Sequence, residues 1–550
     1  MSKSMGLNMA AGTSGMLKQG HKSFEGLSEA VYKNIEAAKA ISEMVSSSMG
    51  PNGMNKLVVN HLNKIIVSSD CTTLLTEFEI QHPAAKMVAL AAEMQNSEYG
   101  DGSNLCVSFA GELLHLAGQL LRQGVHQSEI VSGYKVALAK TLELLPGMVS
   151  HTIEDPRDEA QLIFAVKPVI GSKQQGYEDY LSQLVAQACL TVMPDKDSGK
   201  SPSVNPDAVR VVKLMGGNVM QSTVINGMVL PRGAEGTISC VDSAKITIFG
   251  CGIESESTET SGTVLIRNAD DMLNYNKTEE KALEEVIIAI ANTGTTVLVS
   301  GGTISEMAAH FIAKHGLMSV KIQSKWDMRR LCATVGATAL VRLGPATPEE
   351  MGSCHKVHVK EFGSKKVTIF EQSGMEDTKV ATIVLRSSVQ SVINDLERSC
   401  DDGIACIQHL CRRPHFVPGA GATEMQLATA LREEANKTDS LDQYSIRKFG
   451  EALEVVPRML GQNSGQDVTS LVSKLYAEHK AGGKETGVDP KNSTIFANAT
   501  ESGVVDLLCT KGSAIRLATD AAITVLRVDQ IIMSKVAGGP KTPKPPGHDA

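Results

Sequence analysis

Aromatic residues and positive charge are both scarce in this 550-residue chain. Phe, Trp and Tyr make up only 4% of the residues, and Trp326 is the single tryptophan. Surfaces that stack bases or bind polyproline are therefore not expected. Asp and Glu outnumber Lys and Arg by 61 to 53, which gives a formal net charge of -8. A nucleic-acid binder would carry a basic face instead, so the composition argues against a nucleic-acid partner.

The chain also lacks the signals of export, membrane insertion and disulfide scaffolds. Residues 1–20 contain no apolar segment of the secretory kind, and no apolar run reaches the length of a membrane span. Eleven cysteines occur without CxxC spacing, which argues against zinc ribbons and a disulfide framework. We therefore expect a cytoplasmic protein with reduced thiols and no membrane partner. Its length predicts two to four domains.

Hydrophobic spacing predicts helical segments at both ends of the chain and alternating strands and helices between them. In the N-terminal part, helices are expected at 27–45, 84–94, 105–121 and 128–145, and strands at 57–59 and 65–67. In the middle, strands are expected at 245–249, 263–266, 296–299, 320–322, 367–370 and 380–385, and helices at 304–315 and 326–335. Helix returns from about residue 394, with segments at 423–434, 446–460, 468–479 and 514–533, and residues 536–550 are predicted to be a disordered tail.

Short motifs rich in glycine and aspartate are divided between the two ends of the chain. They read MGPNG at 49–53, SDCTT at 69–73, GDGSN at 100–104, DDG at 401–403 and PGAGATE at 418–424. Glycines let the backbone approach a phosphate, and the free N–H groups of a helix start attract one. The arrangement suggests one nucleotide site assembled from both ends, with another domain inserted between them.

Taken alone, each motif has a simpler interpretation. The glycine segments could be helix-ending turns, Ser103 could be a helix N-cap, and Lys173 could be a surface lysine. Asp70 and Asp402 could be capping residues, although either could also orient a water or bind a metal. Asp101 could hold Mg²⁺. None of the motifs reads GxxxxGK[ST], so a P-loop NTPase is not indicated.

Together, the segments MGPNGMNK, SSDCTTLL, HPAAKM, GDGSN, ERSCDDG, VPGAGATEMQLA and TVLRVDQII resemble the group II chaperonins. These are the ATP-driven folding chambers of archaea and of the eukaryotic cytosol. The resemblance runs from about residue 20 to residue 538. Within it, YGDGSN, QSKWDMRRLC and DLERSCDDGIA are most similar to one subunit type of the eukaryotic cytosolic chaperonin TRiC/CCT.

This resemblance implies a multidomain α and α/β protein with the chaperonin fold. A mainly α-helical equatorial ATP-binding domain would comprise residues 1–150 and 402–550. A small α/β intermediate hinge domain would comprise 151–216 and 370–401. An α/β apical substrate-binding domain would span 217–369 and carry a helical lid protrusion at about 251–280.

The resemblance also implies roles for individual residues. Asp402 and Asp70 would be catalytic, Asp101 would bind Mg²⁺, and Lys173 would sense the γ-phosphate. ATP or ADP would be bound by Met49, Gly50, Pro51, Gly102, Ser103, Asn104, Leu105, Ser172, Lys173, Gly419, Gly421 and Asp506.

The implied function is that of an ATP-hydrolysing chaperone subunit. It would assemble with paralogous subunits in a hetero-oligomeric double ring and enclose unfolded polypeptides such as actin and tubulin by closing a lid, and co-chaperones are candidate partners. Three departures from the family pattern predict slow turnover or weak ATP binding: SDCTT stands for NDGAT, GDGSN for GDGTT, and GAG for GGG. A mainly structural ring subunit with weak or no ATP turnover is one alternative. A stand-alone metabolic kinase is another, although no Walker A lysine is present.

Overall fold

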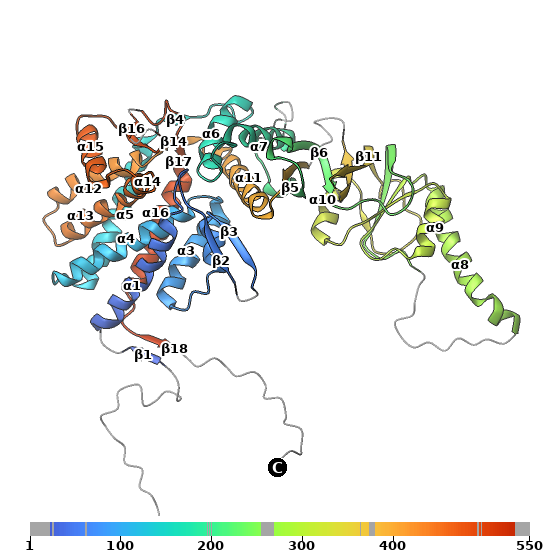
Figure 1. Ribbon diagram of the computed structural model, residues 1–550, viewed down its shortest axis with the longest axis horizontal. Helices are drawn as coiled ribbons and strands as arrows, with labels where there is room; N and C mark the ends of the chain where they lie inside the picture. Colours follow the sequence, from blue (N-terminus) through green and yellow to red (C-terminus); the bar gives the residue numbers. More distant parts are fainter. Residues whose placement is uncertain are drawn as a thin grey trace, which may run out of the picture.

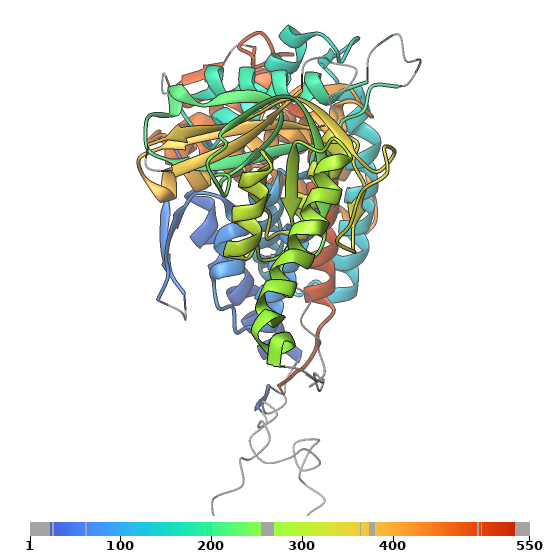
Figure 2. The same ribbon diagram turned by 90° about the vertical axis from the view of Figure 1, so that its right-hand side faces the viewer.

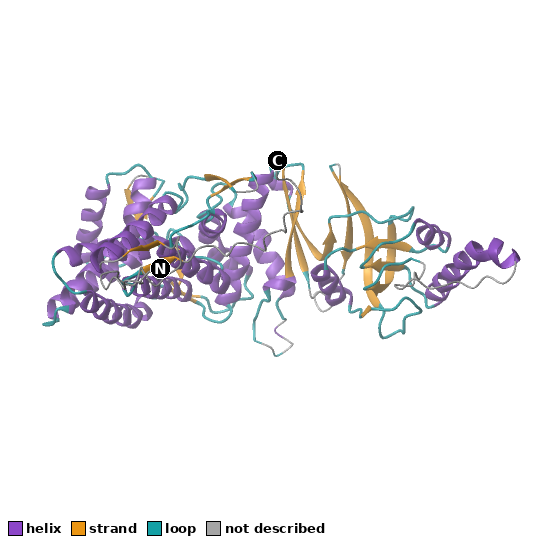
Figure 3. Cartoon of the chain, turned by 90° about the horizontal axis from the view of Figure 1, so that it is seen from below, coloured by secondary structure: helices purple, strands orange, loops and turns teal. Residues whose placement is uncertain are grey.

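The computed structural model describes residues 22–24, 27–60, 63–194, 196, 199, 201–254, 269–363, 365–372, 380–491, 494–496 and 498–533. The strand expected at 263–266 and the tail expected at 536–550 lie outside these residues. The described chain forms an elongated molecule, with a helical body at one end and a β-sheet toward the other (Figure 1). Figure 3 shows that the strands of this sheet gather in the half away from the helical body.

The helical body combines helices from both ends of the chain. The N-terminal part supplies α1 (Leu27–Ser46), α3 (Pro83–Tyr99), α4 (Ser103–Arg122) and α5 (Gln127–Leu144). The C-terminal part supplies α12 (Ala422–Lys437), α13 (Asp442–Leu453), α14 (Val455–Asn463), α15 (Val468–Lys480) and α16 (Leu508–Leu526). One hydrophobic core joins the two parts, so neither end of the chain could form this body alone.

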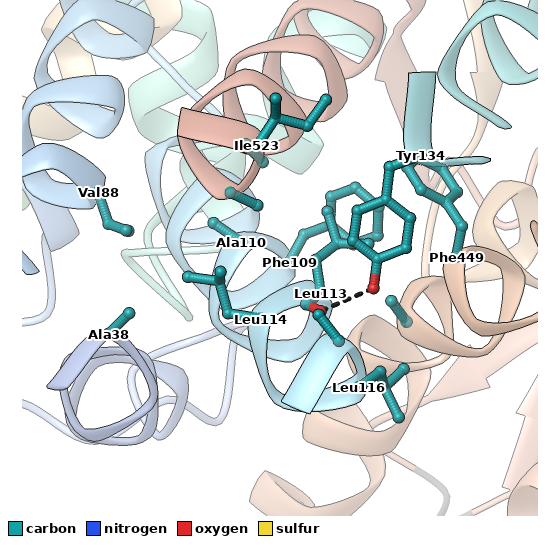
Figure 4. Packing of buried hydrophobic residues seen from close by; sticks show 14 of the residues in the cluster. Ala38, Val88, Phe109, Ala110, Leu113, Leu114, Leu116, Tyr134, Phe449 and Ile523 are labelled. Atoms are coloured by element: carbon teal, nitrogen blue, oxygen red, sulfur yellow. Dashed lines mark hydrogen bonds between the residues drawn. The ribbon is translucent and has the colours of Figure 1, made fainter. Parts of the chain in front are cut away.

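Helix α4 lies at the centre of this core. Its Phe109 packs edge-on against Phe449 of α13, with 5.3 Å between the ring centroids, and Tyr134 of α5 donates a hydrogen bond to Leu113 O at 2.8 Å (Figure 4). A Cβ on Gly111 would lie 2.2 Å from Ser42 Cβ, so this glycine lets α4 approach α1 closely.

Short elements surround the body. The N-terminal part of the chain supplies helix α2 (Cys71–Glu77) and the hairpin of β2 (Lys56–Val59) and β3 (Ile65–Ser68). Strands β4 (His151–Thr152), β14 (His415–Pro418) and β17 (Val505–Leu507) form a small antiparallel sheet. Two further antiparallel pairs are β1 (Lys22–Phe24) with β18 (Ile531–Met533), and β15 (Gly487–Asp489) with β16 (Thr494–Phe496).

Three helices connect the body to the large sheet. Helices α6 (Glu159–Gly171), α7 (Glu178–Val192) and α11 (Gln390–Leu410) share a second core, which also includes side chains of the first two strands of the sheet. The middle of α11 is buried on this core through Leu396, Cys400 and Ile404. Helix α11 therefore packs with α6 and α7 as part of this second core.

The large sheet has the order β5-β13-β6-β12-β11-β7-β8-β9, with β10 paired to β7. The pairs β5–β13, β7–β8, β8–β9 and β7–β10 are parallel, and the pairs of the middle strands are antiparallel. The strands are β5 (Val209–Met215), β6 (Thr223–Leu230), β7 (Cys240–Phe249), β8 (Val297–Ser300), β9 (Met318–Lys321), β10 (Ala339–Leu340), β11 (Gly352–Phe362), β12 (Lys365–Glu371) and β13 (Ala381–Ser387).

Three helices lie beside this sheet: α8 (Ala269–Asn292), α9 (Glu306–Lys314) and α10 (Lys325–Val335). Helix α8 extends past the sheet at the far end of the molecule and stands in front in the view from that end (Figures 1 and 2). The protrusion expected at about 251–280 overlaps the start of α8, but residues 255–268 lie outside the described chain. The boundaries of the three expected domains stay predictions.

The expected fold class is confirmed, whereas two helix predictions are wrong. The helix expected at 446–460 is two helices, α13 and α14. Pro457 cannot donate to the carbonyl of Leu453, and its ring would clash with that carbonyl, so the chain turns between them. The helix expected at 514–533 ends at Leu526, because residues Ile531–Met533 pair with β1 as a strand.

Candidate functional site

Three carboxylates and one lysine meet where α2, α4, α6 and α11 approach one another. Asp70 precedes α2, Asp101 precedes α4, Lys173 follows α6, and Asp402 lies within α11. Lys173 Nζ lies 2.8 Å from Asp70 Oδ1 and also forms an ion pair with Asp402 Oδ2. The side chains of this lysine and both aspartates are no more than 16% exposed. Residues far apart in the sequence thus share one buried charge cluster.

Asp70 makes the capping contacts that were the simpler interpretation of this residue, in addition to its ion pair. Its Oδ2 accepts hydrogen bonds from Thr73 N at 3.0 Å and from Thr73 Oγ1 at 2.7 Å. The first bond satisfies one free N–H group at the start of α2, and the two together fix the carboxylate, which leaves Oδ1 for Lys173. The neighbouring Cys71 is buried.

Glycines shape the loop that carries Asp101. Gly100 ends α3 with φ +74°, and Gly102 precedes α4 with φ +84°. A Cβ on Gly100 would lie 2.4 Å from Ala405 Cβ, so α11 packs directly on this loop. Gly102 N donates to Asp101 Oδ1 at 2.7 Å. The alternative of Ser103 as the N-cap is wrong, because Gly102 holds that position and Ser103 is the first residue of α4.

Burial and charge act in opposite directions on the two aspartates that contact Lys173. Burial favours the neutral form of Asp70, but the Lys173 ammonium and the Thr73 hydrogen bonds outweigh it and lower the pKa to about 2. For Asp402, burial outweighs Lys173 and, together with the charges of Asp101 and Asp70, raises the pKa to about 7. Of the two aspartates, Asp70 has the lower pKa because it also accepts the Thr73 hydrogen bonds.

The pKa values of Asp101 and Lys173, the other two members of the cluster, depend on the same balance between burial and neighbouring charges. Burial raises the pKa of Asp101 despite the opposing effects of Lys173 and the Gly102 N–H, and the charges of Asp506 and Asp70 add to the rise. Burial alone would lower the pKa of Lys173, but Asp402, Asp70 and Asp101 outweigh it, so the ammonium stays charged. The site therefore combines a fixed cation with one carboxylate that titrates near neutral pH.

The loop at residues 49–51 lies beside the start of α4. Met49 is buried against Val455 and Val456, and Leu105 packs on the same cluster. Asn463 Nδ2 donates to Met49 O at 2.9 Å. Gly50 has φ +80° and Pro51 follows it in the turn. This loop and the first turn of α4 thus meet through α14.

Asn104 lies in the first turn of α4, and its side chain is engaged by the protein. Its Nδ2 lies 3.2 Å from Ser48 Oγ and 3.4 Å from Val45 O, and its Oδ1 accepts from Ser108 Oγ at 3.0 Å. Ser172 ends α6 and donates from Oγ to Val169 O at 2.7 Å. Both side chains therefore have structural contacts of their own.

The turn at 419–421 connects β14 to α12. Ala420 has φ +54°, which is uncommon for a residue with a side chain, and Gly421 has φ +80°. A Cβ on Gly421 would lie 3.0 Å from Pro457 Cβ. Asp506 lies opposite Val417 in the neighbouring strand β17. The turn and Asp506 therefore lie at the same end of the small sheet.

The fold also brings into the site residues that no motif marked. Buried Gln95 donates from Nε2 to Asp101 O at 2.9 Å and to Thr510 O at 3.2 Å, so it links the Asp101 loop to α16. Lys511 pairs with Glu424 and Asp506. Glu424 stood in a recognised motif, but Gln95 and Lys511 are single polar residues within helices, which carry no signal in the sequence.

Two negative findings concern the described residues. They contain no group of three or more His, Cys, Asp or Glu side chains that could hold a metal ion. Asp101 is one carboxylate, which fits Mg²⁺, because that ion is commonly held by one or two carboxylates with phosphate and water. Within the same part of the chain, every helix is too short or too polar to span a lipid bilayer.

Comparison with known proteins identifies the class to which this fold and site belong. Residues 41–536 match the TCP-1/cpn60 chaperonin family, and the chain belongs to that family. At a finer level it is similar to T-complex protein 1 subunit theta. It is 45% identical to that subunit of Dictyostelium discoideum (98% of this chain, 99% of the relative), of Homo sapiens (97% and 96%) and of Arabidopsis thaliana (96% and 96%). The subunit type expected from the YGDGSN and QSKWDMRRLC segments was this theta subunit, and the expectation is confirmed.

Proposed function

We propose that the chain is an ATP-hydrolysing chaperonin subunit. The observation that carries this proposal is the convergence of Asp70, Lys173 and Asp402 from three separate chain segments beside the Asp101 loop. Asp402 would accept a proton from the attacking water, and its pKa of about 7 suits a general base at neutral pH. Asp70 would help to orient that water, and Lys173 would contact the γ-phosphate.

The nucleotide would lie between the glycine loop before α4, at residues 100–102, and the glycine turn before α12, at residues 419–421. The N–H groups at the starts of α4 and α12 favour phosphate, and Gly50, Gly102, Gly419 and Gly421 leave room for it. Met49, Pro51, Ser103, Asn104, Leu105, Ser172 and Asp506 would complete the contacts with ATP or ADP. Asp101 would hold Mg²⁺, which neutralises charge on the phosphates when bound.

Assembly and substrate binding follow from membership of the family. The names of the relatives support a subunit of a hetero-oligomeric complex, and we propose a cytoplasmic double ring with paralogous chaperonin subunits. The sheet-bearing half would bind unfolded polypeptides such as actin and tubulin, with co-chaperones as candidate partners. Nucleotide-driven movement of α11 would link the site to closure of a lid, because α11 carries Asp402 and packs on both halves.

A second candidate is a mainly structural ring subunit with weak or no ATP turnover. The engaged side chain of Asn104 favours it, because its amide already bonds to Ser48 and is less available to a phosphate. Ala420, with φ +54°, also gives the turn less freedom than glycine would. These features support slow turnover, whereas the three aspartates support some hydrolysis. The stand-alone kinase receives no support from the comparisons.

The test uses the assembled complex, purified with this subunit carrying Asp402→Asn. Native mass and negative-stain images first establish whether a double ring forms; a small oligomer without a ring would contradict the proposal. We then expect ATP turnover to fall while bound ATP stays constant. Asp520→Asn in α16 is the control, because Asp520 is exposed and its carboxylate makes no hydrogen bond or ion pair among the described residues. Turnover that is unchanged in both variants would favour the structural subunit.

A further inference from the structure

A second buried charge cluster lies next to the site, centred on Lys511 in the first turn of α16. Its Nζ lies 2.9 Å from Glu424 Oε1 and 2.7 Å from Asp506 Oδ2. The side chains of Lys511 and Glu424 are 4% and 1% exposed, whereas that of Asp506 is 46% exposed. Only Asp506 can therefore be reached readily from solvent.

The three residues come from three segments that meet at the candidate nucleotide site. Glu424 stands in the first turn of α12, directly after the turn at 419–421. Asp506 lies in β17, and Lys511 follows in α16. The α16 start is also tied to the Asp101 loop, because Gln95 donates to both Asp101 O and Thr510 O. Lys511 thus links the turn at 419–421, strand β17 and helix α16.

Stability alone is a weak explanation for this arrangement. Burying an ion pair costs desolvation, and a well-packed apolar pair is often equally stable or more so. Glu424 Oε2 is buried and has no hydrogen-bond partner among the described residues, which adds to the cost. A cluster that is costly and adjoins a site is better explained by what it positions.

We propose that Lys511 and Glu424 are positioning residues that set the Asp506 carboxylate for the nucleoside part of ATP. This inference rests on the proposed function. Lys511 binds Asp506 Oδ2 and leaves Oδ1 free to accept a hydrogen bond from a nucleoside hydroxyl or amino group. Glu424 holds Lys511 through a second ion pair, so the ammonium keeps its place when Asp506 engages a ligand.

The test is a double-mutant cycle on ATP affinity, measured by calorimetry with Mg²⁺ present in the full chain. Glu424→Gln/Lys511→Met removes the buried pair together and leaves only the half-exposed Asp506 without its cation partner. We expect this variant and Asp506→Asn each to weaken ATP binding by about tenfold, as for the loss of one hydrogen bond to a charged group. Combining them should weaken it no further, because the pair acts through Asp506.

Controls separate positioning from a general loss of structure. Lys448→Met removes a lysine that contacts Gln119 and Glu451, so it should leave ATP affinity unchanged. If the double variant does not fold, Glu424→Gln alone should weaken ATP binding in the wild-type chain but not in Asp506→Asn. Additive losses, or wild-type affinity in the pair variant, would overturn the inference. Absence of ATP binding by the wild-type chain would instead overturn the proposed function.

Discussion

Replacing Asp402 by asparagine is expected to stabilise the protein at alkaline pH while removing the proposed general base. The carboxylate is buried, and its pKa of about 7 lies well above the ordinary value of 3.8. At about 1.4 kcal/mol per pKa unit, keeping this group charged costs the folded state about 4 kcal/mol. Asparagine has nearly the same shape and carries no charge, so this cost disappears.

The sign of the pH dependence follows from the raised pKa. Between about pH 4 and pH 7 the folded chain holds a proton on Asp402 that the unfolded chain has lost. Stability therefore falls as the pH rises through this range, and the full cost is present above pH 7. The substitution also weakens one contact of Lys173, which reduces the gain in stability by about 2 kcal/mol. We expect a net gain of about 2 kcal/mol at pH 8 and almost none at pH 5.

Thermal unfolding of the full-length chain, followed by circular dichroism at pH 5 and pH 8, measures this difference. The expected gain corresponds to an increase of roughly 2 °C in the unfolding temperature at pH 8. Asp520→Asn in α16 serves as the control for loss of one exposed acidic group from a helix. A variant at Asp402 that is less stable than wild type at pH 8, or equally shifted at both pH values, would refute the reasoning.

Three further predictions address the rest of the site. Asp70 has a lowered pKa, so its carboxylate stabilises the fold above about pH 4, and this contribution shrinks as the pH falls toward 2. We therefore expect Asp70→Asn to lower the free energy of unfolding by about 2 kcal/mol at pH 7, measured by urea unfolding. A loss of the same size at pH 2 would contradict this. Gly421→Ala should cost about 1–2 kcal/mol, and more than Gly465→Ala, because both glycines have positive φ but only Gly421 faces Pro457; equal losses would exclude that contact. Removal of Mg²⁺ with EDTA should weaken ATP binding by at least about tenfold in calorimetry, and unchanged affinity would count against a metal at Asp101.

The hydrophobic pattern predicted most of the helices, and local motifs supplied the candidate site residues. Asp70, Asp101 and Asp402 stand beside small residues in short segments, which made them candidates from the sequence alone, and the fold brings them near Lys173. The break between α13 and α14 was missed because the apolar spacing continues across it, and the effect of Pro457 on the preceding turn was overlooked.

Lys511 could not have been found by the same means. Its two partners lie 87 residues before it and five residues before it, and only the packing of α12 against β17 and α16 brings all three together. A lysine within a helix is normally exposed, so its burial depends on tertiary contacts that have no local signature. Candidate ligand-binding residues in short motifs were thus predictable, whereas the residues proposed to position them were not.

The charge balance of the two clusters explains why this region should depend on a metal. Asp70, Asp101, Asp402, Glu424 and Asp506 are five carboxylates, whereas Lys173 and Lys511 are two cations, so three negative charges would remain if every group were ionised. Burial raises the pKa values of Asp101 and Asp402, and the neighbouring negative charges add to the rise. A triphosphate adds more negative charge, and the N-termini of α4 and α12 contribute only partial positive charges. A divalent cation beside Asp101 would lower that repulsion, so we expect the proposed nucleotide to bind as its magnesium complex rather than free.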